Sequence, residues 1–379
     1  MTSELSSLCS YAKGKVSVDT LSKRNYVSTE NMMPNKGGIV DAGALPSAQY
    51  TQQYIKDDIL VSNIRPYFKK IWMADDDGGC SNDVLVFRAD RGCDSTFLYY
   101  ILANDAFFNY ASATSKGTKM PRGDKTAIMQ YKVPCFNYET QLRIGKLLRS
   151  IDDRIAVNKK INDNLQQQLF SLYENMATAS PCLKEYTLSN LCDFQEGYVN
   201  PPQTHPEYFD GEVKWLRAVD INESFIIETS RTLTKAGFES AKKSALLFEP
   251  NTIAISKSGT IGRLGIIADY MCGNRAVINI APHDTNMLAF IYCFLKSKQR
   301  EFPDMAVGSV QKNLYVSLLE PLSVSIPDNE SLTAFNDVGA SILGMIHNNC
   351  VENTDLANLR DTILPKLMSG EIDVSSVLL

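Results

Sequence analysis

The length, composition and charge of the chain exclude several classes of protein. Its 379 residues suffice for two or three domains, and 44% hydrophobic with 21% charged residues is typical of a globular protein. The formal net charge of −5 argues against nucleic-acid binding through a globally basic surface, although local basic loops can still contact phosphate. The sequence has no run of 18 apolar residues and no secretory signal pattern, so we expect a cytoplasmic protein without a membrane partner.

Cysteine and histidine spacing argues against a metal site. The nine cysteines are scattered without a C-x-x-C pair, and His205, His283 and His347 lie far apart in the sequence. Zinc sites require closely spaced ligands, so the sequence predicts no metal. Unpaired cysteines at these spacings favour packing roles in a reducing compartment.

The first 136 residues have the pattern of a mixed domain of strands and helices. Short apolar runs predict strands, and a longer apolar run predicts a helix with Asp94 or Ser95 as its N-cap. The strands are expected at residues 59–64, 71–75 and 83–88, and the helix at 95–111. A polar loop at 115–125 and a short strand ending near Pro134 complete this domain, which we place at residues 1–136.

A long helix is expected at residues 137–180. From Gln141 to Met176, apolar and asparagine residues recur at alternating steps of four and three, which is the period of a coiled-coil seam. The central seam residues are Ile151, Ile155, Asn158, Asn162 and Leu165. Asparagine at a seam position lowers stability but fixes register and partner choice.

The second half of the chain repeats this plan. The segment Leu5-Ser6-Ser7-Leu8-Cys9 returns as Leu188-Ser189-Asn190-Leu191-Cys192, and we expect a second domain at residues 181–327. A second long helix is expected at 328–371, followed by a tail at 372–379. Its seam residues are Ile342, Ile346, Asn349, Asn353 and Leu356, with Gly339 and Arg360 as interruptions.

Two long helices with the same seam can pair with each other. The sequence therefore predicts an α+β fold in which two tandem-repeat α/β domains are joined by two long helices that form an intramolecular coiled coil. The heptads alone allow either parallel or antiparallel pairing.

Three motifs that could support catalysis or metal binding are incomplete. Asn200-Pro201-Pro202-Gln203 resembles the Asn-Pro-Pro-aromatic motif of amino-methyltransferases, but glutamine replaces the aromatic residue that stacks on a flipped base. Glu212-Val213-Lys214 lacks the second acidic residue that a Mg²⁺-dependent nuclease would need. Asp75-Asp76-Asp77-Gly78 lacks the later acidic ligand of a Ca²⁺ loop. The sequence thus predicts no catalytic residue and no metal ligand.

Polar and basic loops recur at the same two places in both repeats. Arginine can bond guanine, asparagine can bond adenine, and lysine can hold phosphate, so these loops predict contact with double-stranded DNA. In the first domain the candidates are Asn63, Arg65, Tyr67, Lys69, Lys70, Lys116, Thr118, Lys119 and Arg122. In the second domain they are Lys257, Ser258, Thr260, Arg263, Arg275, Gln311, Lys312 and Asn313.

Across nearly its whole length, the chain resembles the specificity subunit of type I restriction-modification systems. The resemblance depends on the two-repeat plan and on local strings whose order and spacing match the family. These strings include Ser62-Asn63-Ile64-Arg65-Pro66, Cys80-Ser81-Asn82-Asp83, Ser258-Gly259-Thr260-Ile261-Gly262, Gln311-Lys312-Asn313 and Leu364-Pro365-Lys366-Leu367-Met368-Ser369-Gly370.

This resemblance implies two target-recognition domains, each reading half of a split DNA sequence, and an antiparallel pair of helices. It implies adenine DNA methyltransferase subunits, two in number, as partners that bind S-adenosylmethionine. A restriction subunit, where present, would use ATP and Mg²⁺. The chain itself would bind no cofactor and catalyse no reaction.

The length of the first helix suggests how far apart the half-sites lie. At about 1.5 Å per residue, the seam from Gln141 to Met176 is about 54 Å long, which is roughly 16 base pairs at about 3.4 Å each. We therefore expect a gapped, asymmetric site within about that span. The alternatives are a methylation-only system, a self-contained methyltransferase or nuclease, and a helical adaptor that never touches DNA.

Overall fold

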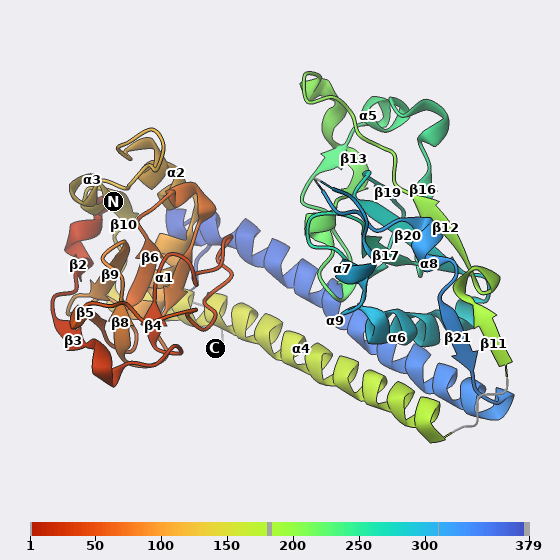
Figure 1. Cartoon of the computed structure of the whole chain (residues 1–379). Coiled ribbons are helices and arrows are strands. Elements are labelled where there is room, and N and C mark those ends of the chain that lie inside the picture. Colours follow the sequence, from red (N-terminus) through yellow and green to blue (C-terminus); the bar gives the residue numbers. More distant parts are fainter. Residues whose placement is uncertain (1, 180–183, 310, 375–379) are drawn as a thin grey trace. The chain divides into compact units, whose positions relative to one another are not determined.

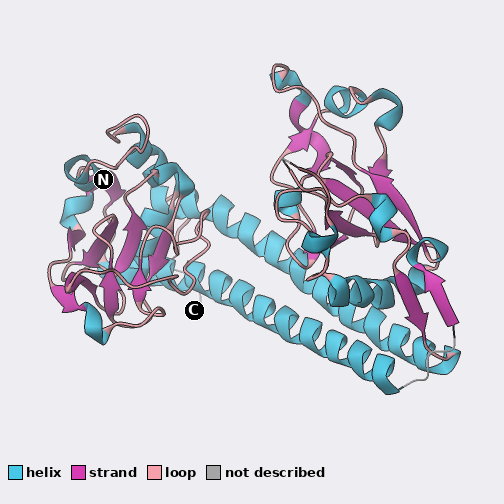
Figure 2. Cartoon of the chain, viewed as in Figure 1, coloured by secondary structure: helices cyan, strands magenta, loops and turns pink. Residues whose placement is uncertain are grey.

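The computed structural model describes residues 2–179, 184–309 and 311–374. These residues form two compact units (Figure 1). The first unit comprises residues 1–154 with 356–379, and the second comprises residues 155–355. Each unit contains one domain of strands and short helices, together with parts of both long helices (Figure 2).

The first domain has three small sheets and three short helices. Its strands are β1 (Thr2–Glu4), β2 (Cys9–Tyr11), β3 (Lys15–Ser17), β4 (Tyr26–Val27), β5 (Tyr50–Tyr54), β6 (Ile59–Ser62), β7 (Ile71–Met73), β8 (Gly78–Cys80), β9 (Val84–Ala89) and β10 (Lys132–Pro134). Its helices are α1 (Ser95–Ala103), α2 (Asp105–Ala113) and α3 (Lys125–Met129), with 3₁₀ turns η1 (Leu5–Ser7), η2 (Val18–Thr20) and η3 (Pro66–Phe68). The sheet orders are β2-β9-β6-β7, β3-β5-β8-β4 and β1-β10.

Strand β6 lies inside the central sheet of the first domain and contributes side chains to the cores on both faces of that sheet. All four of its residues are buried, as expected for a short apolar strand with neighbours on both faces. Side chains alternate along a strand, so Ile59 and Val61 join the core that contains α1. Leu60 points to the other face and joins a second core with Tyr54 and Cys80 of the neighbouring sheet.

The second domain repeats this plan. Its strands are β11 (Lys184–Thr187), β12 (Cys192–Glu196), β13 (Phe209–Leu216), β14 (Phe225–Ile226), β15 (Thr232–Leu233), β16 (Leu247–Phe248), β17 (Ile253–Ser256), β18 (Leu264–Ile267), β19 (Met271–Gly273), β20 (Val277–Pro282) and β21 (Ser323–Ile326). Its helices are α5 (Lys235–Glu239), α6 (Leu288–Lys298), α7 (Phe302–Met305) and α8 (Val316–Leu319), with 3₁₀ turns η4 (Leu188–Asn190), η5 (Pro206–Tyr208), η6 (Ala218–Asp220), η7 (Lys242–Ser244) and η8 (Thr285–Met287). The sheet orders are β12-β20-β17-β18-β14, β15-β13-β19-β16 and β11-β21.

The helix expected at residues 95–111 is divided into α1 and α2. Asn104 separates the two helices because its side chain accepts a hydrogen bond from the Ala106 N–H and so starts a new helix. The equivalent segment of the second domain, residues 285–302, is also divided, into η8, α6 and the start of α7.

The two long helices are α4 (Tyr138–Ala179) and α9 (Asn329–Ser369). Asn137 and Asp328 precede them, and their side chains accept hydrogen bonds from the N–H groups of Thr140 and Ser331, as N-caps do. The expected boundary between residues 180 and 181 lies outside the described residues, as do residues 375–379 of the expected tail. Within the described ranges, no helix has the length and apolarity that crossing a membrane requires.

Seam asparagines show that the long helices pair antiparallel in the second unit. The Asn158 amide donates to Asn353 Oδ1 at 3.1 Å, and the Asn349 amide donates to Asn162 Oδ1 at 2.8 Å. In a parallel pair with the repeat in register, Asn158 would face its own counterpart, Asn349, instead. The predicted α+β fold with an antiparallel pair of long helices is therefore confirmed.

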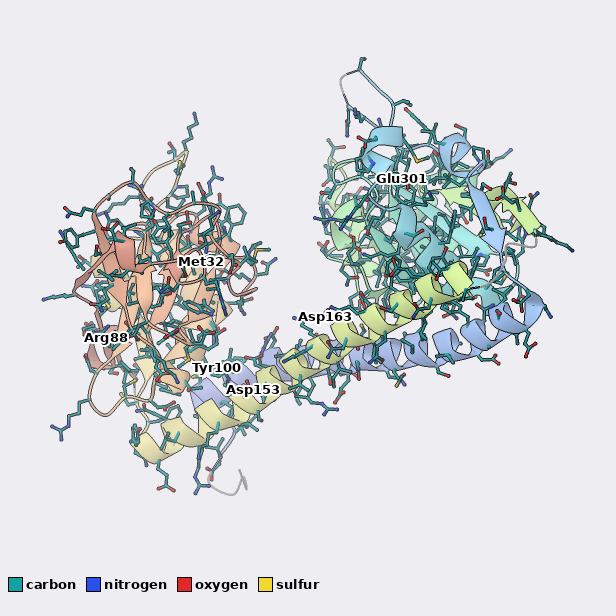
Figure 3. All side chains as sticks on the ribbon, turned by 60° about the horizontal axis from the view of Figure 1, so that its bottom comes forward. Met32, Arg88, Tyr100, Asp153, Asp163 and Glu301 are labelled. Atoms are coloured by element: carbon teal, nitrogen blue, oxygen red, sulfur yellow. The ribbon has the colours of Figure 1, made fainter. Side chains whose placement is uncertain are left out.

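The first unit contains the other end of the helix pair. Ile144 and Leu148 of α4 share a core with Leu364 and Leu367 of α9. Asp152 of α4 accepts hydrogen bonds from Arg360 of α9 and from Tyr100 of α1, each at 2.6 Å. Figure 3 shows Tyr100 beside α4. The interruption of the seam at Arg360 is thus an ion pair between the helices.

Gly339, the other interruption, permits close packing in the second unit. A Cβ atom at this position would lie 2.6 Å from the Ala289 Cβ of α6, which is closer than side-chain carbons approach. Glycine therefore allows α9 to lie directly against α6.

Candidate nucleic-acid interface

Three loops of the first domain meet at the end of β6. The Asn63 N–H donates to the Asp83 carbonyl at 2.8 Å, and the Asn63 carbonyl accepts from the Gly123 N–H at 3.1 Å. The Arg65 N–H donates to the Pro121 carbonyl at 2.8 Å. These backbone bonds join residues 63–70, 81–83 and 115–123 into one cluster, which we call loop cluster 1. The two basic segments predicted from the sequence are therefore neighbours in space.

The second domain joins the equivalent loops with equivalent bonds. The Lys257 N–H donates to the Ala276 carbonyl at 2.7 Å, and the Lys257 carbonyl accepts from the Leu314 N–H at 2.9 Å. Val307 and Asn313 form a β-bridge that closes the third loop. Residues 257–263, 274–276 and 307–313 thus form loop cluster 2, of which Val310 lies outside the described residues.

The cations of loop cluster 1 differ in whether they have an acidic partner. Lys69 pairs with Asp105 at 2.8 Å, Lys116 with Asp124 at 2.5 Å and Arg122 with Asp83 at 3.0 Å. The Lys70 ammonium donates to the Thr29 carbonyl at 2.6 Å, and burial lowers its pKa. Between residues 2 and 179, Arg65 and Lys119 form no ion pair with an acidic side chain, so they are the cations best able to take a phosphate.

The cations of loop cluster 2 also differ in whether they have an acidic partner. The Lys257 ammonium is 2.9 Å from Glu196 and 4.8 Å from the centre of the Tyr315 ring, and its side chain is only 12% exposed. Arg263, Arg275 and Lys312 form no ion pair with an acidic side chain within the described part of the chain. Of these three, Arg275 and Lys312 are exposed.

The remaining candidates are polar or aromatic side chains on the same clusters. Tyr67 and Thr118 of loop cluster 1 are exposed, as are Thr260 and Gln311 of loop cluster 2. Ser258 and Asn313 are half-buried, and the Asn313 amide donates to the Gln311 carbonyl at 3.1 Å.

Asn63 is buried rather than presented to solvent. Its side chain is 8% exposed, and its amide oxygen has no hydrogen-bond partner within the described structure. Asn63 and Lys257 occupy equivalent positions in the two domains, since each joins the three loops of its cluster through the backbone. This geometry suits a residue that positions the loops.

Sequence reasoning missed several residues at these sites. Phe68 is 39% exposed next to Tyr67, and Glu196 accepts hydrogen bonds from both Lys257 and Tyr198 at 2.9 Å. The bond to Glu196 raises the pKa of the Tyr198 hydroxyl. The repeat contained a signal for Glu196. Strand β12, which ends at Glu196, is the counterpart of β2 and lies at the equivalent edge of the central sheet.

The incomplete catalytic motifs lie apart from any assembled site. The Gln203 side chain accepts a hydrogen bond from Arg231 at 3.1 Å, and Lys214 pairs with Asp269 at 3.0 Å. Among the described residues, no group of three or more His, Cys, Asp or Glu side chains could hold a metal ion. A cavity of about 740 Å³ lies between α4 and α6 and includes Gln166, Tyr292 and Lys296 in its lining.

Comparisons with known proteins agree with this architecture. The sequence model of the family described as "Type I restriction modification DNA specificity domain" matches residues 1–167 and 183–354, one match for each repeat. The chain is 24% identical over 308 residues to the MjaIX type I restriction enzyme specificity subunit of Methanocaldococcus jannaschii. That alignment covers 76% of this chain and 71% of the relative.

Two further similarities have different extents. The HindI specificity subunit of Haemophilus influenzae is 27% identical over 176 residues, which is 45% of this chain and 38% of that subunit. The solved structure of a type I restriction-modification S subunit from M. genitalium matches with a TM-score of 0.57 at 18% identity, and the match covers 97% of this chain and 96% of that one.

Proposed function

This chain belongs to the type I restriction-modification DNA specificity family, and from that premise we propose that it reads a gapped, asymmetric DNA sequence for a methyltransferase complex. As a specificity subunit it recognises DNA and is not itself the catalyst. The observation that carries the proposal is that equivalent backbone bonds, made by Asn63 in one domain and Lys257 in the other, assemble two loop clusters with different side chains. Equivalent scaffolds with different reading residues are suited to two different half-sites.

The gap in the proposed site follows from the long helices. Two recognition domains in one chain, separated in sequence by a helix of 42 residues, suit two half-sites with unread bases between them. The asymmetry follows from the loops, because Arg65, Tyr67 and Lys119 have no identical counterparts in loop cluster 2.

The partners are proposed to be adenine DNA methyltransferase subunits, two per chain, with restriction subunits where the system includes them. S-adenosylmethionine would bind the methyltransferase, and ATP with Mg²⁺ would serve the restriction subunit.

In the second unit, the helix pair carries exposed apolar side chains suited to docking: Ile161 is 42% exposed, and Val338 and Met345 are each 48% exposed. An aspartate at both Ile161 and Met345 should weaken co-purification with the methyltransferase, and unchanged co-purification would contradict this docking surface.

Reconstitution followed by methylome sequencing tests the main proposal. The chain, expressed with the methyltransferase encoded beside it in a host without other adenine methylation, should direct methylation to an interrupted, asymmetric sequence. An uninterrupted palindrome would contradict the gapped site. Methylation or cleavage by the purified chain alone would contradict the non-catalytic role, and a complex without salt-dependent DNA binding would indicate a protein adaptor.

Loop variants test which residues read which half. Replacing Arg65 and Lys119 with methionine should relax or abolish reading of one half-site, and replacing Arg275 and Lys312 should affect the other. Each lost phosphate contact should lower the salt-dependence slope of binding by about one. Lys56, an exposed lysine preceding β6, at the opposite end of that strand from loop cluster 1, is the matched control, and its replacement should change neither half-site.

A further inference from the structure

Loop cluster 1 presents two adjacent aromatic rings to solvent. Tyr67 is 52% exposed and Phe68 is 39% exposed, and their ring centres lie 4.8 Å apart. Exposed aromatic pairs are unusual on a globular surface and often mark a binding site. Arg65, which has no acidic partner in the described part of the chain, immediately precedes the η3 turn that carries both rings.

Several bonds hold the two rings in place. Pro66 begins the turn and is buried, and the Phe68 N–H donates to the Arg65 carbonyl at 2.9 Å. The carbonyls of Phe68 and Lys69 accept the N–H groups of Asn35 and Lys36, both at 2.8 Å. A rigid, exposed aromatic pair loses little conformational entropy when it binds.

The backbone around the rings is strained, and the repeat shows that this strain is avoidable. Arg65 and Lys69 flank the turn with φ values of +50° and +52°, in the left-handed region that side chains other than glycine rarely adopt. In the equivalent loop of the second domain, Gly259 and Gly262 have φ values of +76° and +85°. The first domain therefore keeps Arg65 and Lys69 where glycine would be less strained.

The side chains of Arg65 and Lys69, the two residues with positive φ, differ in their contacts. Lys69 and Lys36 both pair with Asp105 of α2, at 2.8 and 3.0 Å, and this anchors the turn to the domain. Burial opposes ionisation of Asp105, but the two ammonium groups outweigh it and hold the pKa of this carboxyl below its usual value. Arg65 is left to provide positive charge beside the rings.

We propose that Tyr67 and Phe68 form an aromatic wedge that inserts at a base step of the half-site read by the first domain. Apolar and aromatic side chains that enter a base step unstack it and bend the duplex, and nearby cations hold the flanking phosphates. Arg65 and Lys119 supply those cations on the two loops that meet here. This inference depends on the proposed DNA-reading function and adds distortion of the DNA as part of the recognition.

In the described part of the second domain, the loop at residues 257–263, which is equivalent to residues 63–70, carries no such pair of rings. Thr260 and Ile261 occupy the tip of its loop between the two glycines, and Ile261 packs against the domain core. The proposal therefore assigns DNA distortion only to the half-site read by the first domain. The energy of deforming that half-site depends on its base sequence and so contributes to specificity.

The test uses the chain assembled with its methyltransferase subunits and a duplex bearing the site found by methylome sequencing. Tyr67→Ala with Phe68→Ala should weaken binding by about 10-fold to 100-fold, in line with the loss of base stacking on aromatic side chains. Duplexes with 2-aminopurine at successive positions of each half-site should become fluorescent at a step of one half-site with the unmodified complex. That signal should disappear in the double variant, and Tyr67→Phe should retain it.

Controls separate the wedge from folding and from the underlying function. Tyr50→Ala removes a tyrosine of similar exposure, 53%, from β5 of the same domain and should leave the fluorescence unchanged. Equal fluorescence in the double variant, or weakened methyltransferase assembly without DNA, would overturn the wedge. Failure of the unmodified complex to bind the site would instead overturn the proposed DNA-reading function.

Discussion

The ammonium group of Lys257 has partners within its own domain, although the residue lies in a polar loop. The sequence predicts that Lys257 contacts DNA, but its side chain is held by Glu196 and lies over the Tyr315 ring. Glu196 belongs to β12, far from Lys257 in the sequence, and only the sheet brings the two strands together. The sequence of residues 256–263 therefore predicts a polar loop, but it does not show the partners of the side chains in that loop.

Replacing Lys257 should affect stability more than DNA binding. Lys257→Met leaves the Glu196 carboxylate, 20% exposed, without its cation, and should lower the free energy of unfolding by about 1–3 kcal/mol. Glu196→Gln combined with Lys257→Met should recover part of this loss, because no unpaired charge remains. Urea unfolding of the unmodified chain and of the two variants measures the effect. A fully stable Lys257→Met chain whose DNA binding has a lower salt-dependence slope would show that this lysine contacts phosphate after all.

At the scale of elements, the repeated heptads predicted two long helices and their shared seam, but not the direction of pairing. Direction depends on which side chains meet, and the bonds from Asn158 to Asn353 and from Asn349 to Asn162 settle it. The central strands β6, β7 and β9 were predictable because buried central strands have continuous apolar runs. The break between α1 and α2 was not, because it depends on a single capping interaction by Asn104.

The bonded asparagines predict an unusual dependence of stability on paired substitution. Asn162→Leu alone should destabilise the chain by about 1–3 kcal/mol, because the Asn349 amide loses its partner in the helix interface. Asn162→Leu combined with Asn349→Leu should instead raise the melting temperature above that of the single variant, since two apolar residues then meet in the seam. Circular dichroism melting checks both outcomes. Equal melting temperatures for the single and double variants would contradict coupling between these positions.

At the scale of the whole molecule, the repeat suggests that the two domains are interchangeable parts. Each has its own buried core and its own loop cluster, and the order β2-β9-β6-β7 of the first central sheet returns as β12-β20-β17-β18 in the second, where β14 adds one more strand. The long helices that carry them run antiparallel, as the asparagine bonds show. The sequence alone predicted two copies of one domain, but which bases each copy reads depends on side chains whose partners lie in other loops.

A chain with two copies of the first domain should read a symmetric site. If residues 2–136 replace residues 184–327, both loop clusters carry the same reading side chains, and the antiparallel pairing of the helices predicts that the two copies read opposite strands of the duplex. We therefore expect an interrupted palindrome made of one half-site and its inverted copy. Methylome sequencing of the variant complex measures the result, with the unmodified chain as the control. A direct repeat of the half-site would mean that the two domains read DNA in the same direction, and retention of the original asymmetric site would mean that the second half is read elsewhere in the complex.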